Sequence, residues 1–258
     1  MFHKAKDLMG YKLGAKDGEI GGVKDFYFED TNWTIRYLIA DTGTWLSGRL
    51  VLISPFALEN VDAATRHFNV KLAKEHIERS PSIDAHKPVS RQFEAEYARH
   101  YGWPMYWYGP ALWGPTPYPF YEAPIGEPNS AETSAAMAEE RGDPHLRSAS
   151  EVAGYHLHAT DGDLGHVHDF LVGDEDWAIR YVIVETGSWW AGKKVLIPTH
   201  WIREVNWDQS KVYADVSQAA IKAAPEYSDE LRLSRAFEQK LFQAYRRDPY
   251  WAGRKHAA

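Results

Sequence analysis

Short runs in which apolar and polar residues alternate, broken by turn residues, fill two long stretches of the chain. In each stretch the runs flank an Asp-Gly pair, at residues 17–18 and 161–162. Such a pair between alternating runs is the strongest short-range signal of a β-hairpin, because these residues tolerate the positive φ that a tight turn requires. The pattern predicts a mainly β protein with short helices, in which each stretch opens with a hairpin.

Three further strands are predicted after each hairpin. They are residues 33–40, 49–53 and 67–72 in the first stretch and residues 177–184, 193–197 and 211–216 in the second. Five or six short strands in about 70 residues indicate a small closed or half-closed barrel, because closure removes vulnerable strand edges, and an open sheet is the alternative. The Gly21-Gly22 pair predicts a β-bulge that curls the sheet.

Helices are predicted after the strands of each stretch. Short helices are expected at 74–79 and 218–223, and longer ones at 90–101 and 228–245. The longer helices carry apolar residues four positions apart, which gives each of them one apolar face. We expect that face to pack against another part of the protein.

The two stretches are copies of one another. An offset of 144 residues (154 minus 10) aligns Gly10–Gly109 with Gly154–Gly253 without a gap. About 34 of about 100 aligned positions are identical, and a constant offset over that length indicates an internal repeat. The identities continue into the longer helices, so the repeated unit is a whole domain with its helix.

The repeat predicts the domain organisation. Its parts are a first barrel (1–82), a helix with an aromatic tail (83–109), a linker (110–145), a second barrel (146–226) and a C-terminal helix and tail (227–258). The first half of the linker is rich in Pro, Gly and aromatic residues, which predicts an extended segment. We expect its aromatic side chains to pack on a barrel or on a partner, since they would otherwise expose a large apolar surface.

The amino-acid composition limits the classes of function that the protein can have. The chain of 258 residues is 44% hydrophobic and 25% charged, as is typical of a folded globular protein, and its net charge of -7 disfavours nucleic acid as a partner. It contains no cysteine, which excludes disulfides and thiolate sites and fits a cytoplasmic protein. No stretch has the length expected of a signal peptide's apolar region or of a transmembrane segment.

Each copy resembles the PRC-barrel domain, the small β-barrel of the photosynthetic reaction centre's H subunit and of the C-terminal half of the ribosome maturation factor. The resemblance covers roughly 75 residues per copy and leaves out the linker and the tail helices. In the first copy it rests on Leu8, Gly10, Tyr11, Asp17, Gly18, Ile20, Gly21, Val23, Asp25, Phe26, Trp33, Ile35, Arg36, Tyr37, Val51, Leu52, Ile53 and Pro55. In the second it rests on Val152, Gly154, Tyr155, Asp161, Gly162, Leu164, Gly165, Val167, Asp169, Phe170, Trp177, Ile179, Arg180, Tyr181, Val195, Leu196, Ile197 and Pro198.

The resemblance implies a non-catalytic adaptor barrel that holds other proteins or stabilises an assembly. A protein partner or self-association is therefore expected, and peripheral association with a membrane complex stays open. The membrane anchor of the H subunit has no counterpart in this sequence, which argues against that subunit's role. No cofactor is expected.

The alternative function is binding of a metal or small ligand by the second copy. His156, His158, His166 and His168 form two H-x-H pairs on the strands of one hairpin. Residues two apart on a strand share a face, so the four imidazoles could reach one metal ion. The first copy has Lys and Gly at these positions, so the fold does not need them, and a solvated polar face is the other interpretation.

Two further groups of residues are candidates for structural and partner-binding roles. Arg36 and Arg180 are expected to form cross-strand ion pairs with Asp25 and Asp169, respectively. The candidate partner-binding side chains are aromatic residues beside the Thr-Gly turns and in the linker, namely Trp45, Trp189, Trp190, Trp113, Tyr118 and Phe120.

No catalytic motif supports an enzyme. The patterns GxSxG, GxxxxGK[ST] and HExxH are absent from the sequence. Asp41 and Glu185 occupy matching positions, and we interpret them, like the other acidic residues near turns, as solvated carboxylates. Enzymatic activity in a cleft is the least supported of the three functional hypotheses.

Overall fold

The computed structural model describes residues 1–83, 89, 91–120, 146–187, 192–229 and 233–249. The chain forms two compact units, which are treated separately below. The first contains Met1, residues 3–150 and residues 172–179, and the second contains Phe2, residues 151–171 and residues 180–258. Residues 172–179, in the middle of the predicted second barrel, therefore belong to the first unit.

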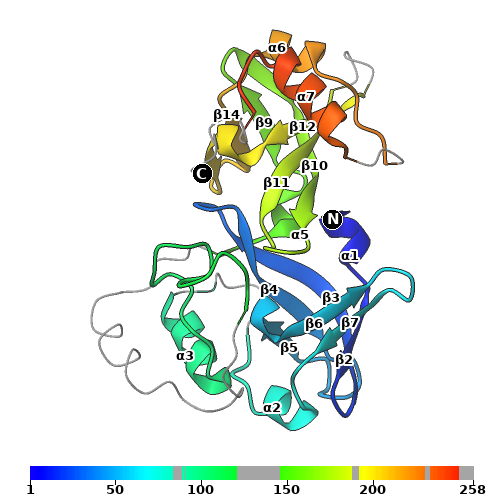
Figure 1. Cartoon of the computed structure of the whole chain (residues 1–258), viewed down its shortest axis with the longest axis vertical. Coiled ribbons are helices and arrows are strands. Elements are labelled where there is room, and N and C mark those ends of the chain that lie inside the picture. The colour runs from blue at the N-terminus through cyan, green and yellow to red at the C-terminus, as the bar shows by residue number, and fades with distance from the viewer. Residues whose placement is uncertain (84–88, 90, 121–145, 188–191, 230–232, 250–258) are drawn as a thin grey trace, which may run out of the picture. The chain divides into compact units, whose positions relative to one another are not determined.

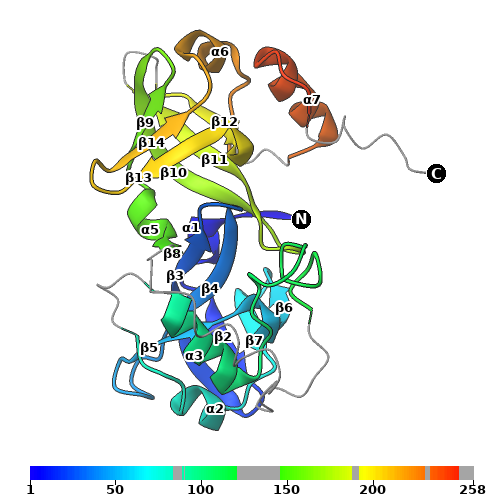
Figure 2. The same cartoon turned by 90° about the vertical axis from the view of Figure 1, so that its left-hand side faces the viewer.

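The first unit is built on one predominantly antiparallel sheet (Figure 1). Its strands follow the order β5-β4-β3-β2-β7-β6, and β8 also pairs with β3. Their bounds are β2 (Lys12–Ala15), β3 (Gly18–Glu29), β4 (Thr34–Asp41), β5 (Leu50–Ile53), β6 (Leu58–Asp62), β7 (His67–Val70) and β8 (Leu146–Ser148). Figure 2 shows β6 and β7 side by side, where the pairing order ends.

The second unit repeats this order as β12-β11-β10-β9-β14-β13. The bounds of these strands are β9 (His156–Ala159), β10 (Gly162–Gly173), β11 (Ile179–Thr186), β12 (Lys194–Pro198), β13 (Ile202–Asn206) and β14 (Lys211–Ala214), and the short strand β1 spans Phe2–Lys4. In both sheets the first hairpin is antiparallel and its first strand pairs in parallel with a later strand. The predicted fold class, mainly β with short helices, is confirmed.

Short helices complete both units. They are α1 (Ala5–Leu8), α2 (Lys74–Glu78), α3 (Arg91–Tyr101), α5 (Ala149–Val152), α6 (Gln218–Ala223) and α7 (Arg235–Ala244), with 3-10 turns η1 (Pro55–Ala57) and η3 (Thr199–Trp201). The prediction that the last helix begins at 228 is wrong, because Ser234 caps α7 by accepting a hydrogen bond from the Phe237 amide at 3.2 Å. No helix within the described ranges has the length and apolar character needed to span a bilayer.

A β-bulge bends the first hairpin of each sheet. Leu13 pairs with Gly21 and Gly14 with Glu19, so Ile20 is the extra residue on β3. The predicted bulge is thus confirmed. Gly21 has φ +128°, and a Cβ on it would lie 1.9 Å from the Asp41 carbonyl oxygen. Only glycine lets the two backbones approach this closely.

The hairpin turn of the second copy completes the core of the first unit. The Trp177 ring lies 6.3 Å from Phe26 and 6.0 Å from Phe68, and Trp177 is 3% exposed. The Ile35 amide donates to the Trp177 carbonyl at 2.9 Å, and the Ile179 amide donates to the Trp33 carbonyl at 2.6 Å. Backbone pairing and aromatic packing together explain why residues 172–179 fold with this unit.

A buried glutamate fixes the long helix onto the sheet in each unit. In the second unit the Tyr181 hydroxyl on β11 donates to Glu238 on α7 at 2.6 Å, and Glu238 is 5% exposed. In the first unit Glu94 of α3 accepts a hydrogen bond at 2.7 Å from Tyr106, which follows the helix, and it also hydrogen-bonds Tyr37 on β4. Burial, together with the charge of Glu94, raises the pKa of Tyr106 and of Tyr37 on β4 well above 10. The sequence signal for this contact is a glutamate at matching positions, Glu94 and Glu238, of two otherwise diverged helices.

Replacing Gly21 tests the close approach of β3 and β4. We expect Gly21→Ala to lower the free energy of unfolding by about 3 kcal/mol or more, because the strands must separate to admit the methyl group. Gly43→Ala is the control: Gly43 has φ +54° but open space around a Cβ, so its cost is about 1 kcal/mol. Urea unfolding measures both, and equal losses would contradict the close-approach argument.

Removing one hydroxyl tests the helix attachment in the second unit. Tyr181→Phe leaves the buried Glu238 without this donor, so we expect stability to fall by about 1–3 kcal/mol. In the control Tyr213→Phe, the lost hydroxyl donates to Gln209 at an exposed site, and the change is within about 0.5 kcal/mol. Thermal unfolding followed by circular dichroism distinguishes the two, and a neutral Tyr181→Phe would show that the contact adds no stability.

Candidate functional site

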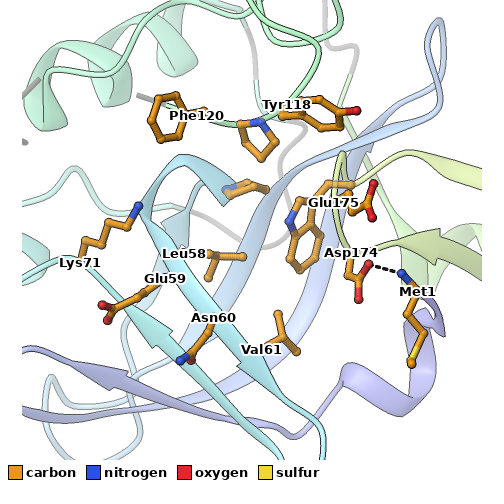
Figure 3. A pocket seen from close by; sticks show the side chains of 13 residues that line it. Met1, Leu58, Glu59, Asn60, Val61, Lys71, Tyr118, Phe120, Asp174 and Glu175 are labelled. Carbon is orange, nitrogen blue, oxygen red and sulfur yellow. Dashed lines mark hydrogen bonds and ion pairs between the residues drawn. The ribbon is translucent and has the colours of Figure 1, made fainter. Parts of the chain in front are cut away.

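A groove of about 550 Å³ lies in the first unit (Figure 3). One side is strand β6, which contributes Leu58, Glu59, Asn60 and Val61. The other side consists of linker residues 118–120 and of Asp174, Glu175 and Trp177, and Figure 3 shows Tyr118 and Phe120 across the groove from β6. All three segments belong to the same unit.

Strand β6, which lines this groove, is an end strand of the sheet. It is the last strand in the pairing order, and β7 is its only neighbouring strand among the described residues. Glu59 and Asn60 are exposed, and Leu58, Val61 and Asp62 are half-buried. An end strand offers backbone donors and acceptors on its outer side, which suit the addition of another extended segment.

Aromatic side chains form the opposite rim. Tyr118 is 50% exposed and Phe120 is 57% exposed, and these are large exposed apolar side chains in a unit whose other aromatic residues are mostly buried. The rim is held by local hydrogen bonds: the Tyr118 carbonyl accepts from the Thr116 hydroxyl at 2.6 Å and from the Phe120 amide at 2.8 Å. These two predicted partner-binding residues therefore border the same groove.

Trp113 anchors this linker segment inside the unit. Its side chain is fully buried, its Nε1 donates to the Asp176 carbonyl at 2.9 Å, and its ring meets Phe56 edge-on at 5.0 Å. The prediction that Trp113 is a partner-binding residue is wrong, because it is part of the core. Its burial fixes the chain from which Tyr118 and Phe120 project.

Negative charge predominates along the groove. Its lining contains three carboxylates, those of Glu59, Asp174 and Glu175, and two cationic groups, the Lys71 amine and the Met1 amino group, which pairs with Asp174. Burial opposes the ionised form of Asp174, but hydrogen bonds from the amino group of Met1 and from His3 lower its pKa. Glu59 and Glu175 are exposed, so their charges face solvent.

Arg36 lies beneath the same linker, in a buried network. It donates to Glu29 through Nε at 3.1 Å and through a terminal nitrogen at 2.7 Å, and to the Leu112 carbonyl at 2.7 Å. Its guanidinium lies 3.8 Å from the centre of the Tyr106 ring and 4.8 Å from that of Trp113. The predicted pairing of Arg36 with Asp25 is wrong, because the register places Asp25 opposite Ile39, three residues farther along β4.

Asp25 instead attaches β8 to β3. Its carboxylate accepts hydrogen bonds from the amide and the hydroxyl of Ser150, at 3.0 Å and 2.9 Å, and from the hydroxyl of Ser148. Asp25 and its counterpart Asp169 both accept from the next residue's amide, at 2.7 Å and 2.8 Å. Both carboxylates thus fix the local backbone through hydrogen bonds.

In the second copy a glycine replaces the carboxylate partner of the arginine. Gly173 occupies the position of Glu29 (29 plus 144), and Arg180, the counterpart of Arg36, is exposed. The linker aromatics that cover Arg36 belong to the first unit. The two arginines, although identical in the repeat, therefore have different environments.

The histidines of the second hairpin divide into separate groups. His166 and His168 on β10 face Glu185 on β11, with their ligand atoms and the carboxylate oxygen within 4.8 Å of one another. His158 instead bonds Asp163 at 2.8 Å and lowers the pKa of that carboxyl. His156 is exposed and is the register partner of His166. The four predicted imidazoles do not form one cluster, and Glu185 was missed as a candidate ligand.

Three predicted aromatic partner-binding residues remain, and of these only Trp45 lies within the described residues. Trp45 is half-buried, and the Lys74 amine lies 4.5 Å from the centre of its ring. Trp189 and Trp190 lie outside the described residues. A partner-binding role for Trp45 stays a prediction.

The strand order, the bulged hairpin and the packed helix define a small β-barrel-like module that occurs in both units. Residues 147–221 match the family model of the PRC-barrel domain. The family predicted from the sequence is thereby confirmed for the second copy. No curated protein matches the chain.

Replacing the buried Arg36 tests the ion pair, and the same replacement at Arg180 in the second copy is the control. Arg36→Met leaves the carboxylate of Glu29, only 6% exposed, without its ion partner, so we expect a loss of about 3–5 kcal/mol. Arg180→Met at the exposed counterpart changes stability by about 0.5 kcal/mol or less. Urea unfolding measures both variants.

Adding Glu29→Gln to Arg36→Met separates the cost of an unpaired buried charge from the cost of lost packing. The double variant removes the unpaired carboxylate, so it recovers part of the loss if charge burial causes it. Equal stability of the single and the double variant would instead assign the loss to packing of Arg36 against Tyr106 and Trp113.

Proposed function

We propose that this protein is a non-catalytic assembly protein that acts through protein contacts, and that its first unit binds an extended peptide segment of a partner along β6. The observation that carries the proposal is the combination, in one groove, of an end strand and the exposed rings of Tyr118 and Phe120. A PRC-barrel module in the same chain is in keeping with such a role.

The backbone of β6 supports an extended occupant. An added strand pairs its main-chain groups with the free edge, which supplies affinity without requiring a specific sequence. The alternation of side chains along the added strand then directs every second residue toward the groove. Leu58 and Val61, half-buried on β6, and the buried Trp177 provide apolar contacts there.

The aromatic rim supports specific recognition. Tyr and Phe rings are common anchors of protein interfaces, because they bury a large area at a small cost in side-chain entropy. The segment that carries Tyr118 and Phe120 is fixed by buried Trp113, so the rings are already positioned before binding. Prior positioning reduces the entropy that binding costs.

Charge indicates the kind of peptide. Because the carboxylates along the groove outnumber the cationic groups by three to two, a segment that alternates apolar residues with Lys or Arg is favoured over an acidic one. The chain's net charge of -7 adds a long-range attraction for such a segment. The partner is thus proposed to present an extended, basic and apolar stretch.

A displayed library of random 12-residue peptides, selected on the full chain, tests the proposal. We expect the selected peptides to alternate apolar and basic residues and to lose about tenfold or more in affinity for Tyr118→Ser/Phe120→Ser, because each ring is an anchor. Fluorescence anisotropy of a labelled selected peptide gives the dissociation constants.

Tyr108→Ser serves as the matched control, since Tyr108 is 43% exposed in the same unit and does not line the groove. Its affinity for the peptide should match that of the wild type. Peptides that bind both variants equally, or that are acidic, would contradict the proposal. Concentration-dependent dimers that disappear in the rim variant would identify a second copy of this chain as the occupant instead.

A further inference from the structure

The outward face of β10 and β11 in the second unit holds three groups with metal-ligating chemistry. The His168 Nδ1 lies 3.2 Å, and the His166 Nε2 3.7 Å, from the same oxygen of Glu185. All three side chains are partly accessible, with 44%, 28% and 35% exposure for His166, His168 and Glu185. This cluster lies outside the groove in the first unit and does not depend on it.

We propose that His166, His168 and Glu185 bind one divalent transition-metal ion, with zinc as the reference ion. Neutral imidazole nitrogens and a carboxylate oxygen are the donors that zinc takes in catalytic and surface sites. Ligands held about 2.0–2.2 Å from a tetrahedral ion lie about 3.4 Å from one another. The distances from both imidazoles to the carboxylate match that spacing without a change of backbone.

The sheet itself sets this arrangement. Because side chains alternate along a strand, the imidazoles at 166 and 168 project from the same face of β10, whereas Val167 between them is buried. In the first copy the positions that correspond to His166 and Glu185, namely Gly22 and Asp41, are register partners on adjacent strands. The carboxylate therefore belongs directly across from one imidazole and diagonal to the other.

Comparison of the copies distinguishes the metal site from an ordinary ion pair. The first copy has Gly22, Lys24 and Asp41 at the three positions. It retains a carboxylate but replaces one imidazole by glycine and the other by a cation, which repels a metal ion. The second copy alone presents three neutral or anionic ligands, so the proposed stoichiometry is one ion per chain.

Three protein ligands leave at least one coordination position of a tetrahedral ion for water or for a donor from another molecule. His156, the register partner of His166, is not within the 4.8 Å group. His158 is engaged with Asp163 on the same hairpin. The site is therefore assigned to two histidines and one glutamate, which differs from the four histidines that the sequence pattern suggested.

Isothermal titration of the chelator-treated full chain with zinc chloride tests the assignment. We expect one ion per chain, and an affinity that falls about tenfold or more in His166→Ala and in His168→Ala, because each removes one of three ligands. Glu185→Gln, which keeps the size of the side chain but removes its charge, should also weaken binding. Zinc should raise the melting temperature of the wild type and not that of the His166→Ala/His168→Ala double variant.

His158→Ala is the matched control, since it removes an imidazole from the same hairpin outside the cluster. It should bind zinc with the wild-type affinity. All these side chains face outward, and circular dichroism before zinc is added verifies that each variant is folded. Three results would overturn the proposal. They are no zinc binding by the wild type, equally strong binding by the double variant, and a greater loss of affinity in His158→Ala than in His168→Ala.

Discussion

The close approach of two backbones at the glycine of the bulge determines which side chains of each sheet point inward and which point outward. A Cβ at Gly21 or Gly165 would lie about 2 Å from a carbonyl oxygen of the next strand, at 1.9 Å and 2.1 Å. The bulge that this glycine permits inserts one residue, so that Leu164 and Val167 both point inward although they are three positions apart. Beyond the bulge, the alternation of side chains places His166 and His168 together on the outward face. One backbone constraint thus bends the sheet and decides which face carries the polar chemistry.

Two copies of one scaffold carry different chemistry because a few positions diverged. Where the first copy has Glu29 and a buried arginine, the second has Gly173 and an exposed one. Where the second copy has imidazoles, the first has Gly22 and Lys24. Both copies keep the bulge and the glutamate that fixes the helix. The shared features are those that the sheet and helix need, and the divergent positions include those of the proposed metal site.

The linker shows how an apolar segment can serve both the core and the surface. Trp113 is buried against Phe56 and covers Arg36, whereas Tyr118 and Phe120 remain about half exposed a few residues later. Burying a charged guanidinium requires hydrogen bonds for its nitrogens, and Glu29 and the Leu112 carbonyl supply them. The aromatic cover therefore belongs to the stability of the unit, and only its far end is available to a partner.

The amino-acid sequence alone predicts the mainly β fold, the hairpins at the Asp-Gly pairs, the bulge and the family of the second copy, because strand periodicity, turn chemistry and the internal repeat are visible in it without a structure. It did not determine the partner of Arg36. A separate bulge on β4 leaves Arg36 as the extra residue between the pairs Tyr27–Tyr37 and Phe28–Ile35, and so directs it to Glu29. Likewise, only the tertiary structure placed Glu185 beside two histidines and buried Trp113. Periodicity gives the face on which a side chain lies, but register and long-range packing decide which group it meets there.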